Sequence, residues 1–89
     1  MQVNLIGIRT MDFKPKDGEQ IKGTQLFVTF PEDGTKGLVA EKLFFRHDAE
    51  AQPPEGIKPG DVLDVTYGRK NKILAVTKLD GKKMPPLGN

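Results

Sequence analysis

Hydrophobic and polar residues alternate along the chain in short extended segments. The segments are rich in Val, Ile, Leu, Phe and Thr, and ten glycines and seven prolines separate them at short intervals. Such segments, bounded by Gly and Pro, are typical of strands joined by turns. The pattern predicts five strands, over residues 2–13, 20–30, 37–46, 62–67 and 72–79.

The first predicted strand has hydrophobic residues in both of its alternating phases. Val3 and Leu5 share one phase, whereas Ile6 and Ile8 share the other, so neither face of the strand is purely polar. A long strand that bends at Gly7 and changes which face is buried fits a barrel better than a flat sheet.

Turn residues connect the predicted strands. Asp17-Gly18 is a strong hairpin signal because glycine accepts positive φ freely, and residues 31–34 and 68–71 predict two further turns. The longest break, residues 47–60, contains the pair Pro53-Pro54, which would end a helical turn at once, so we expect a loop there.

The order of these elements is hairpin, third strand, connecting segment and hairpin, which is the order of an OB-fold. The sequence therefore predicts an all-β protein: a small five-stranded antiparallel OB-like barrel over residues 1–80, followed by a short flexible C-terminal tail over residues 81–89. An SH3-like barrel is the alternative fold.

Length and composition limit where such a domain works. A chain of 89 residues forms one domain that buries only about 60–65% of the surface its unfolded chain exposes, so we expect a homodimer that covers more apolar surface. The chain has no cysteine, whereas small secreted domains usually carry disulfides. We see no signal peptide and no apolar run near the ~20 residues that span a bilayer. We therefore expect a cytoplasmic protein with no membrane partner.

Charge is unevenly distributed although the net charge is only +2. Residues 65–89 carry six basic side chains and one acidic side chain, a net charge of +5, whereas residues 31–64 carry four basic and eight acidic side chains, a net charge of −4. Such asymmetry indicates one positive face, although chance clustering on a solvated surface would give the same count.

The sequence shows no pattern typical of catalysis or metal binding. His47 is the single histidine, it has no cysteine partner, and no glycine-rich phosphate-binding motif is present. Asp61 and Asp64 lie three residues apart on a predicted strand and point to opposite faces rather than to a common metal ion. We therefore expect no enzymatic activity, no cofactor and no metal site.

One aromatic residue of the second predicted strand is expected to face outward. Leu26 and Val28 form an apolar phase, whereas Phe27 shares the other phase with Gln25 and Thr29. Proteins that bind single-stranded nucleic acid combine a positive groove with aromatic side chains on which bases stack. Phe27 is a candidate for such stacking, unless a second apolar layer or a dimer partner covers it.

The third predicted strand alternates cations with an aromatic residue. Lys42, Phe44 and Arg46 share one phase, whereas Phe45 shares the other phase with Leu43. We expect the Lys42–Phe44–Arg46 row on a binding face and Phe45 in the core.

Two hairpin tips carry the remaining basic candidates, and in OB-folds such loops flank the binding face. Lysines that blunt a sheet edge are the competing interpretation. Tyr67, at the start of the second tip, is in phase with Leu63 and Val65 and is expected to be packed. The predicted nucleic-acid-binding residues are Phe13, Lys14, Lys16, Lys22, Phe27, Lys42, Phe44, Arg46, Arg69, Lys70 and Lys72.

These features give the chain a resemblance to a known family. The hairpin KPKDGEQIKGTQLFVTF, the strand GLVAEKLFF and the closing hairpin DVLDVTYGRKNKILAVTKL resemble the small OB-fold single-stranded DNA-binding proteins of the filamentous-phage gene V type. The resemblance covers residues 3–80 and implies a symmetric dimer that coats single-stranded DNA during replication or transfer of a phage or mobile element. The family usually has an aromatic residue at the tip of the closing hairpin, where this chain has residues 69–72, RKNK. The resemblance therefore implies an electrostatic role for this loop.

Three hypotheses about function follow. The leading one is a sequence-tolerant single-stranded DNA-binding protein. The second is an RNA-binding module with an OB or SH3-like fold, and the third is a protein–protein adaptor whose outward aromatic residues form an interface. The first two predict a steep loss of affinity with salt because binding releases counterions from phosphates, and the third predicts none.

Overall fold

The computed structural model describes the backbone of residues 1–83 and the side chains of residues 1–70 and 72–79. Residues 84–89, the end of the predicted tail, lie outside the described residues. The strands are β1 (Gln2–Phe13), β2 (Ile21–Phe30), β3 (Val39–Arg46), β4 (Asp61–Tyr67) and β5 (Ile73–Lys83), with a short 3₁₀ turn η1 (Arg69–Asn71) between the last two. No helix in the described residues is long and apolar enough to cross a membrane.

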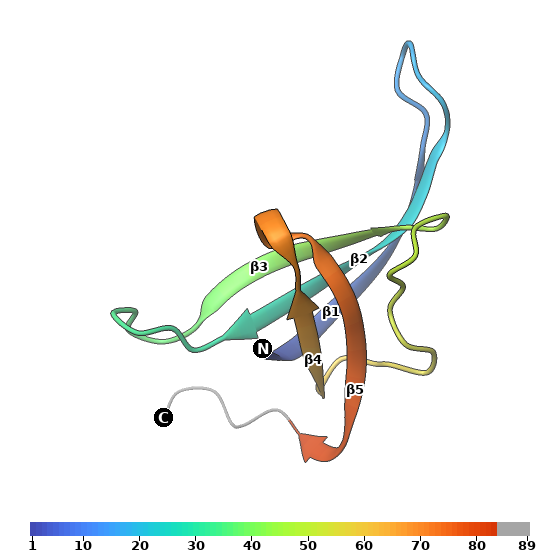
Figure 1. Ribbon diagram of the computed structural model, residues 1–89. Coiled ribbons are helices and arrows are strands. Elements are labelled where there is room, and N and C mark those ends of the chain that lie inside the picture. The colour runs from blue at the N-terminus through green and yellow to red at the C-terminus, as the bar shows by residue number, and fades with distance from the viewer. Residues whose placement is uncertain (84–89) are drawn as a thin grey trace.

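The five strands form one antiparallel sheet in the order β3-β2-β1-β4-β5 (Figure 1). The predicted all-β, five-stranded antiparallel architecture is confirmed. Closure into a barrel is not confirmed, because β3 and β5 are the two edges of the sheet and no strand pairing joins them within residues 1–83. Hydrophobic and polar residues alternate along the strands in the same way in a curled open sheet and in a closed barrel. The alternation therefore does not predict whether the two edge strands pair.

A β-bulge interrupts β1 where the sequence predicts a bend. The register of β1 against β2 shifts between Leu5, which pairs with Val28, and Gly7, which pairs with Phe27. The extra residue in the bulge is Ile6, so Leu5 faces the core with Val28 whereas Gly7 lies on the opposite face with Phe27. Before the bulge, the odd-numbered residues of β1 face the core. From Gly7 onward, the odd-numbered residues lie on the opposite face.

The core lies between the sheet's curled halves. Leu5, Leu26 and Leu63 are fully buried, and the loop before β4 adds Ala51 and Ile57 as partly buried residues. Burial of an aliphatic or aromatic side chain stabilises the fold by about 1.5–3 kcal/mol. The buried cluster consists of Val3, Leu5, Leu26, Val28, Phe30, Leu43, Phe45, Leu63, Val65 and Val76.

Two strands differ from the prediction by more than one residue at one end. β3 begins at Val39 rather than at residue 37, because Gly37 adopts a φ of +86° that a strand does not use. β5 continues past residue 79 to Lys83, which pairs with Asp61 at the start of β4. The backbone of residues 81–83, which the sequence predicts to be part of the tail, therefore belongs to the sheet.

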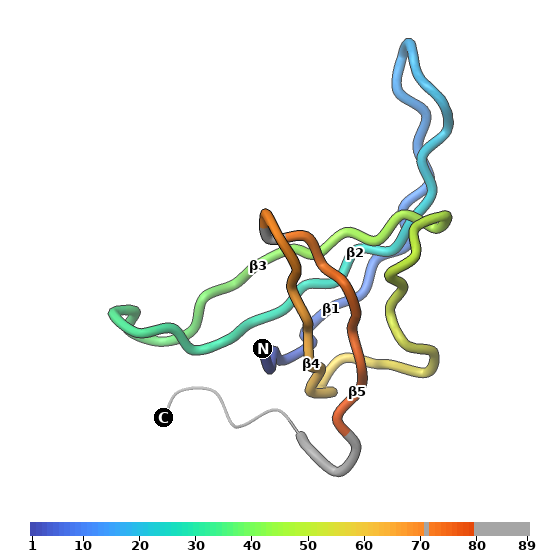
Figure 2. The backbone as a smooth tube through the Cα atoms, viewed as in Figure 1, coloured from blue at the N-terminus to red at the C-terminus, as the bar shows by residue number. Residues whose placement is uncertain are grey.

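The β1–β2 hairpin extends well beyond the rest of the sheet. Figure 2 shows it as an arm standing out from the body of the molecule, and the molecule measures 46 × 28 × 25 Å along its principal axes. A hydrogen bond from the Gly18 amide to the Pro15 carbonyl, 3.3 Å long, closes the turn at its tip. The arm therefore holds the candidate residues of the first hairpin tip away from the core.

Candidate nucleic-acid interface

The strands β1, β2 and β3 present candidate residues on one common face. Directly paired residues of neighbouring antiparallel strands lie on the same side of a sheet. Phe27 pairs with Gly7 on one side and with Lys42 on the other, and Gln25 pairs in the same way with Arg9 and Phe44. We call this surface the aromatic–basic face and define it by Arg9, Phe27, Lys42, Phe44 and Arg46.

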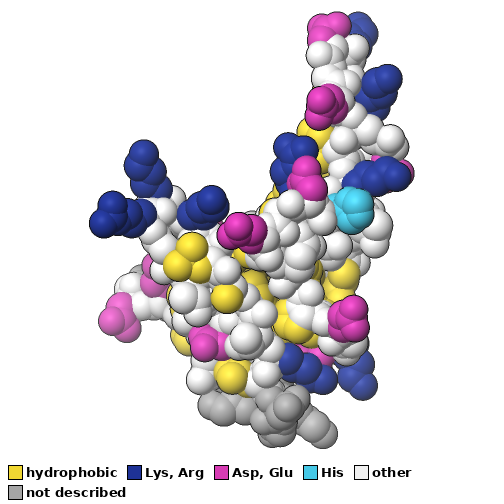
Figure 3. Space-filling model, turned by 45° about the vertical axis from the view of Figure 1, so that its right-hand side comes forward, with side chains coloured by type: hydrophobic (Ala, Val, Ile, Leu, Met, Phe, Trp, Pro, Cys, Tyr) yellow, Lys and Arg dark blue, Asp and Glu magenta, His cyan; other side chains and the backbone are white. Residues whose placement is uncertain are grey.

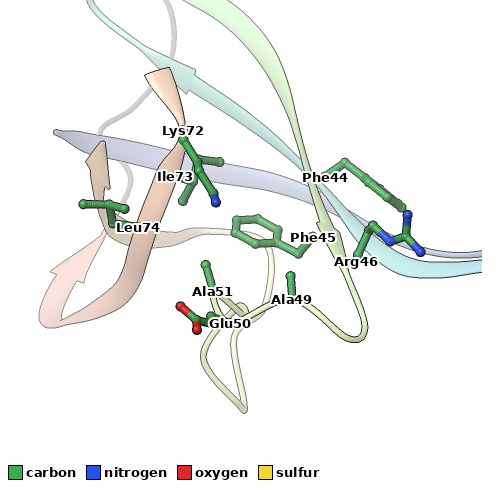
Figure 4. Close-up of a pocket in the computed structure, with 9 residues that line it drawn as sticks. All are labelled: Phe44, Phe45, Arg46, Ala49, Glu50, Ala51, Lys72, Ile73 and Leu74. Atoms are coloured by element: carbon green, nitrogen blue, oxygen red, sulfur yellow. The ribbon is translucent and has the colours of Figure 1, made fainter. Parts of the chain in front are cut away.

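The adjacent residues Phe44 and Phe45 point to opposite sides of β3, as the sequence predicts. Phe44 is 39% exposed on the aromatic–basic face, whereas Phe45 is 3% exposed and belongs to the core cluster. Figure 4 shows the two rings leaving the strand in different directions. The exposed residue of the pair is the one that alternates with Lys42 and Arg46.

Both rings of the aromatic–basic face lie over glycines of a neighbouring strand. A Cβ atom added to Gly7 would lie 3.2 Å from Cδ2 of Phe27, and one added to Gly23 would lie 2.6 Å from Cζ of Phe44. Phe27 is half-buried by this arrangement. Because glycine has no side chain, each ring can pack directly against the backbone of the neighbouring strand.

The cations of the aromatic–basic face are accessible. Lys42, Arg9 and Arg46 are all exposed. Arg46 Nε lies 3.3 Å from Asp48 Oδ1 in an exposed ion pair, and such a pair contributes little to stability because water screens it. Arg46 can therefore exchange this carboxylate for a phosphate at small cost.

The β1–β2 arm carries cations that are balanced by acids. Phe13 is 45% exposed and pairs with Ile21 in the phase of the aromatic–basic face. Lys22 pairs with Asp12 and therefore lies on the opposite face of the hairpin. Lys14 and Lys16 are exposed at the tip. Residues 12–22 contain three lysines and also three acidic residues, Asp12, Asp17 and Glu19, so the arm carries no net charge.

The β4–β5 turn has cations without neighbouring acids in the sequence. Arg69, Lys70 and Lys72 are exposed, and residues 65–79 contain no acidic residue. Lys70 adopts a left-handed φ of 59° within η1. Figure 3 shows basic side chains gathered at this turn, whereas basic and acidic side chains are mixed along the arm. The second turn is thus the stronger positive element.

A hollow lies between the two edge strands, next to the aromatic–basic face. Its volume is about 460 Å³, within the range of ligand pockets. Lys72, just before β5, lines it together with three residues of β3, of which Phe45 points toward Lys72 whereas Phe44 and Arg46 point away from it (Figure 4). The lining consists of Phe44, Phe45, Arg46, Ala49, Glu50, Ala51, Lys72, Ile73 and Leu74.

Tyr67 packs against the core, as predicted, rather than joining the aromatic–basic face. Burial raises the pKa of its hydroxyl above the ordinary value of 10.0, and the negative charge of Glu41 raises it further. The phenol therefore stays neutral at physiological pH and adds no negative charge near the basic turn.

Two features of the site are missed by sequence reasoning. Arg9 belongs to the aromatic–basic face, and the bulge at Ile6 places it there by reversing the phases of β1. The signal in the sequence is that hydrophobic residues occur in both alternating phases of the first predicted strand, which indicates a reversal of its faces. The hollow has no sequence signal, because its lining comes from three separate segments.

Comparisons of the chain with protein families, with curated protein sequences and with solved structures found no match. What the site does must therefore be argued from its own side chains.

Proposed function

We propose that this protein binds single strands of nucleic acid, with single-stranded DNA as the leading substrate and little dependence on base sequence. The observation that carries the proposal is the aromatic–basic face. Phe27 and Phe44 lie there as exposed or half-exposed rings beside Lys42, Arg46 and Arg9. Rings stack on bases of any sequence, and cations attract the phosphates between them.

The resemblance to the gene V type of protein supports a role in replication or transfer of a phage or mobile element, and we include that role in the proposal. The finer description of the fold, an OB-like barrel left open between β3 and β5, is part of the same proposal. A solved structure in which another strand separates β1 from β2 or from β4 would contradict it.

A titration over a series of salt concentrations tests the proposal against its alternatives. We expect the protein to bind labelled oligo-dT, with log Kd rising linearly with log salt at a slope of about 0.7 for each phosphate contact. Duplex DNA should bind more weakly, because its bases are not available to the rings. Tighter binding to oligo-rU would favour the RNA-binding alternative. Binding to none of these ligands would reject nucleic acid in favour of the adaptor.

We also propose a homodimer. Among the described residues, Met1, Ile6, Ile8 and Leu38 are exposed hydrophobic side chains outside the aromatic–basic face and the hollow. A second copy that covers Ile6 and Ile8 would supply apolar burial that an 89-residue chain lacks. Light scattering should give about 20 kDa, twice the chain mass of 9.8 kDa. A mass that stays near that of one chain across a wide concentration range would contradict the dimer.

A further inference from the structure

The hollow between the sheet edges combines an apolar floor with a charged rim. Phe45 and Ile73, which belong to or pack against the core, supply apolar surface, and Leu74 adds an exposed apolar wall. Lys72 lies at the rim just before β5, and Arg46, which also lines the hollow, directs its guanidinium to the adjoining aromatic–basic face (Figure 4). The hollow therefore suits a ligand with a flat, largely apolar body and negative charge beside it.

We propose that the hollow receives one unstacked base of the bound strand while Lys72 at its rim, and Arg46 on the adjoining aromatic–basic face, hold the phosphates before and after that base. This inference rests on the proposed function and adds a specific subsite to it. A volume of about 460 Å³ exceeds what a single base needs and leaves room for its sugar. Phe44 and Arg46 belong both to the aromatic–basic face and to the lining of the hollow, so a strand that follows the face leads into the hollow.

The charge at the rim favours a nucleic acid over the other occupant that a sheet edge attracts, an extended peptide. An edge strand offers unpaired backbone groups to any peptide. However, Arg69 and Lys70 lie in the same turn as Lys72, and residues 65–79 contain no acid. A polyanion gains from this positive charge, whereas a neutral peptide does not.

We expect Glu50 to add a preference at this one base to binding that is otherwise sequence-tolerant. Glu50 is the acidic side chain among the described lining residues, and its carboxylate repels phosphate but accepts hydrogen bonds from amino groups. Carboxylates accept from the N4 amino group of cytosine, and thymine has no amino group to offer. We therefore expect oligo-dC to bind more tightly than oligo-dT, and the Glu50→Gln variant to reduce that preference.

The test is to fill the hollow without touching the aromatic–basic face. Ala49 is exposed and lines the hollow, so Ala49→Leu fills space there without entering the core. Ala75 is exposed on β5 and is not among the lining residues, so Ala75→Leu is the matched control. Leu74→Ala, at a side chain that is 56% exposed, removes one wall and serves as a second variant. Each is titrated with oligo-dC and with an abasic oligonucleotide of the same length.

We expect Ala49→Leu to bind oligo-dC about tenfold more weakly than the unchanged protein, the effect of losing one base contact. Leu74→Ala should weaken this binding in the same direction, and Ala75→Leu should not change it. Affinity for the abasic strand and the salt slope should stay the same in all variants, because the phosphate contacts remain.

Four outcomes would overturn the subsite. In the first, the unchanged protein binds oligo-dC and both hollow variants bind it equally well, so the proposed function stands and the subsite fails. In the second, the affinity of the hollow variants falls by the same factor for the abasic oligonucleotide and for oligo-dC, which would mean that no base enters the hollow. If the unchanged protein binds no single strand, the proposed function and the subsite fail together. Loss of extended-peptide binding in Ala49→Leu, with nucleic-acid affinity intact, would assign the hollow to a peptide instead.

Discussion

Replacing Phe45 with alanine is expected to lower the free energy of unfolding by about 3–5 kcal/mol, whereas the same change at Phe44 is expected to lower it by less than about 1 kcal/mol. Phe45 is 3% exposed within the core cluster, so its removal leaves a cavity that the neighbouring side chains fill only in part. Phe44 lies on the surface over Gly23. Urea denaturation followed by circular dichroism measures both values.

The pair also separates stability from binding. Phe44→Ala should keep the fold and lose about tenfold in affinity for oligo-dT, because one stacking ring is missing. Phe45→Ala should remove a large part of the about 5–15 kcal/mol by which a domain is stable. Equal losses of stability at the two positions would contradict the assignment of one ring to the core and the other to the aromatic–basic face.

Truncating a ring and removing cations should weaken binding in different ways. Phe27→Ala is expected to reduce affinity for oligo-dT about tenfold or more with the salt slope nearly unchanged, because stacking releases no counterions. The double variant Arg69→Gln with Lys70→Asn should reduce affinity and flatten the slope by about 1.4, since two contacts at about 0.7 each are lost. Asparagine suits position 70 because it tolerates the left-handed backbone of that residue.

A matched variant controls for the overall charge. Lys36→Gln with Lys58→Gln removes the same two positive charges from loops outside the aromatic–basic face and the hollow, and it should leave the slope nearly unchanged. An equal flattening in both double variants would mean that net charge, rather than the β4–β5 turn, drives binding. Because Phe27 is half-buried, thermal denaturation must show that Phe27→Ala is folded at the temperature of the titration.

The positions of the strands could be predicted from the sequence because turn residues encode them locally. Glycines with positive φ at residues 34, 37, 56 and 60 lie in the breaks between strands. The end of β5 was missed because Gly81 follows Asp80 there, a pair typical of a turn. Its pairing with β4, which carries the strand to Lys83, is a long-range interaction that local sequence does not report.

The candidate site could be predicted only where it depends on alternation within one strand. Because side chains alternate between the two faces of a strand, the sequence places Phe44 on one face with Lys42 and Arg46, and Phe45 on the other. It fails for Arg9, because the mixed phases of β1 indicate a reversal without showing that Ile6 is the extra residue. That residues near Lys72 and residues of β3 line one hollow depends on how far the sheet curls, which no single strand encodes. Whether these residues bind nucleic acid stays a prediction.

The bulge in β1 decides where this strand can lose a residue. Ile6 pairs with no residue of β2, so deleting it would leave Leu5 opposite Val28 and Gly7 opposite Phe27, and Arg9 would stay on the aromatic–basic face. A strand that kept Ile6 but lost the bulge would instead exchange its two faces as far as Phe13. At the tip of the arm, residues 14–20 lie outside both strands, and the turn there can lengthen or shorten without changing which side Phe13 and Ile21 occupy. Evolutionary insertions and deletions should therefore collect at the arm's tip and at the unpaired residue of the bulge, and avoid the paired residues of β1.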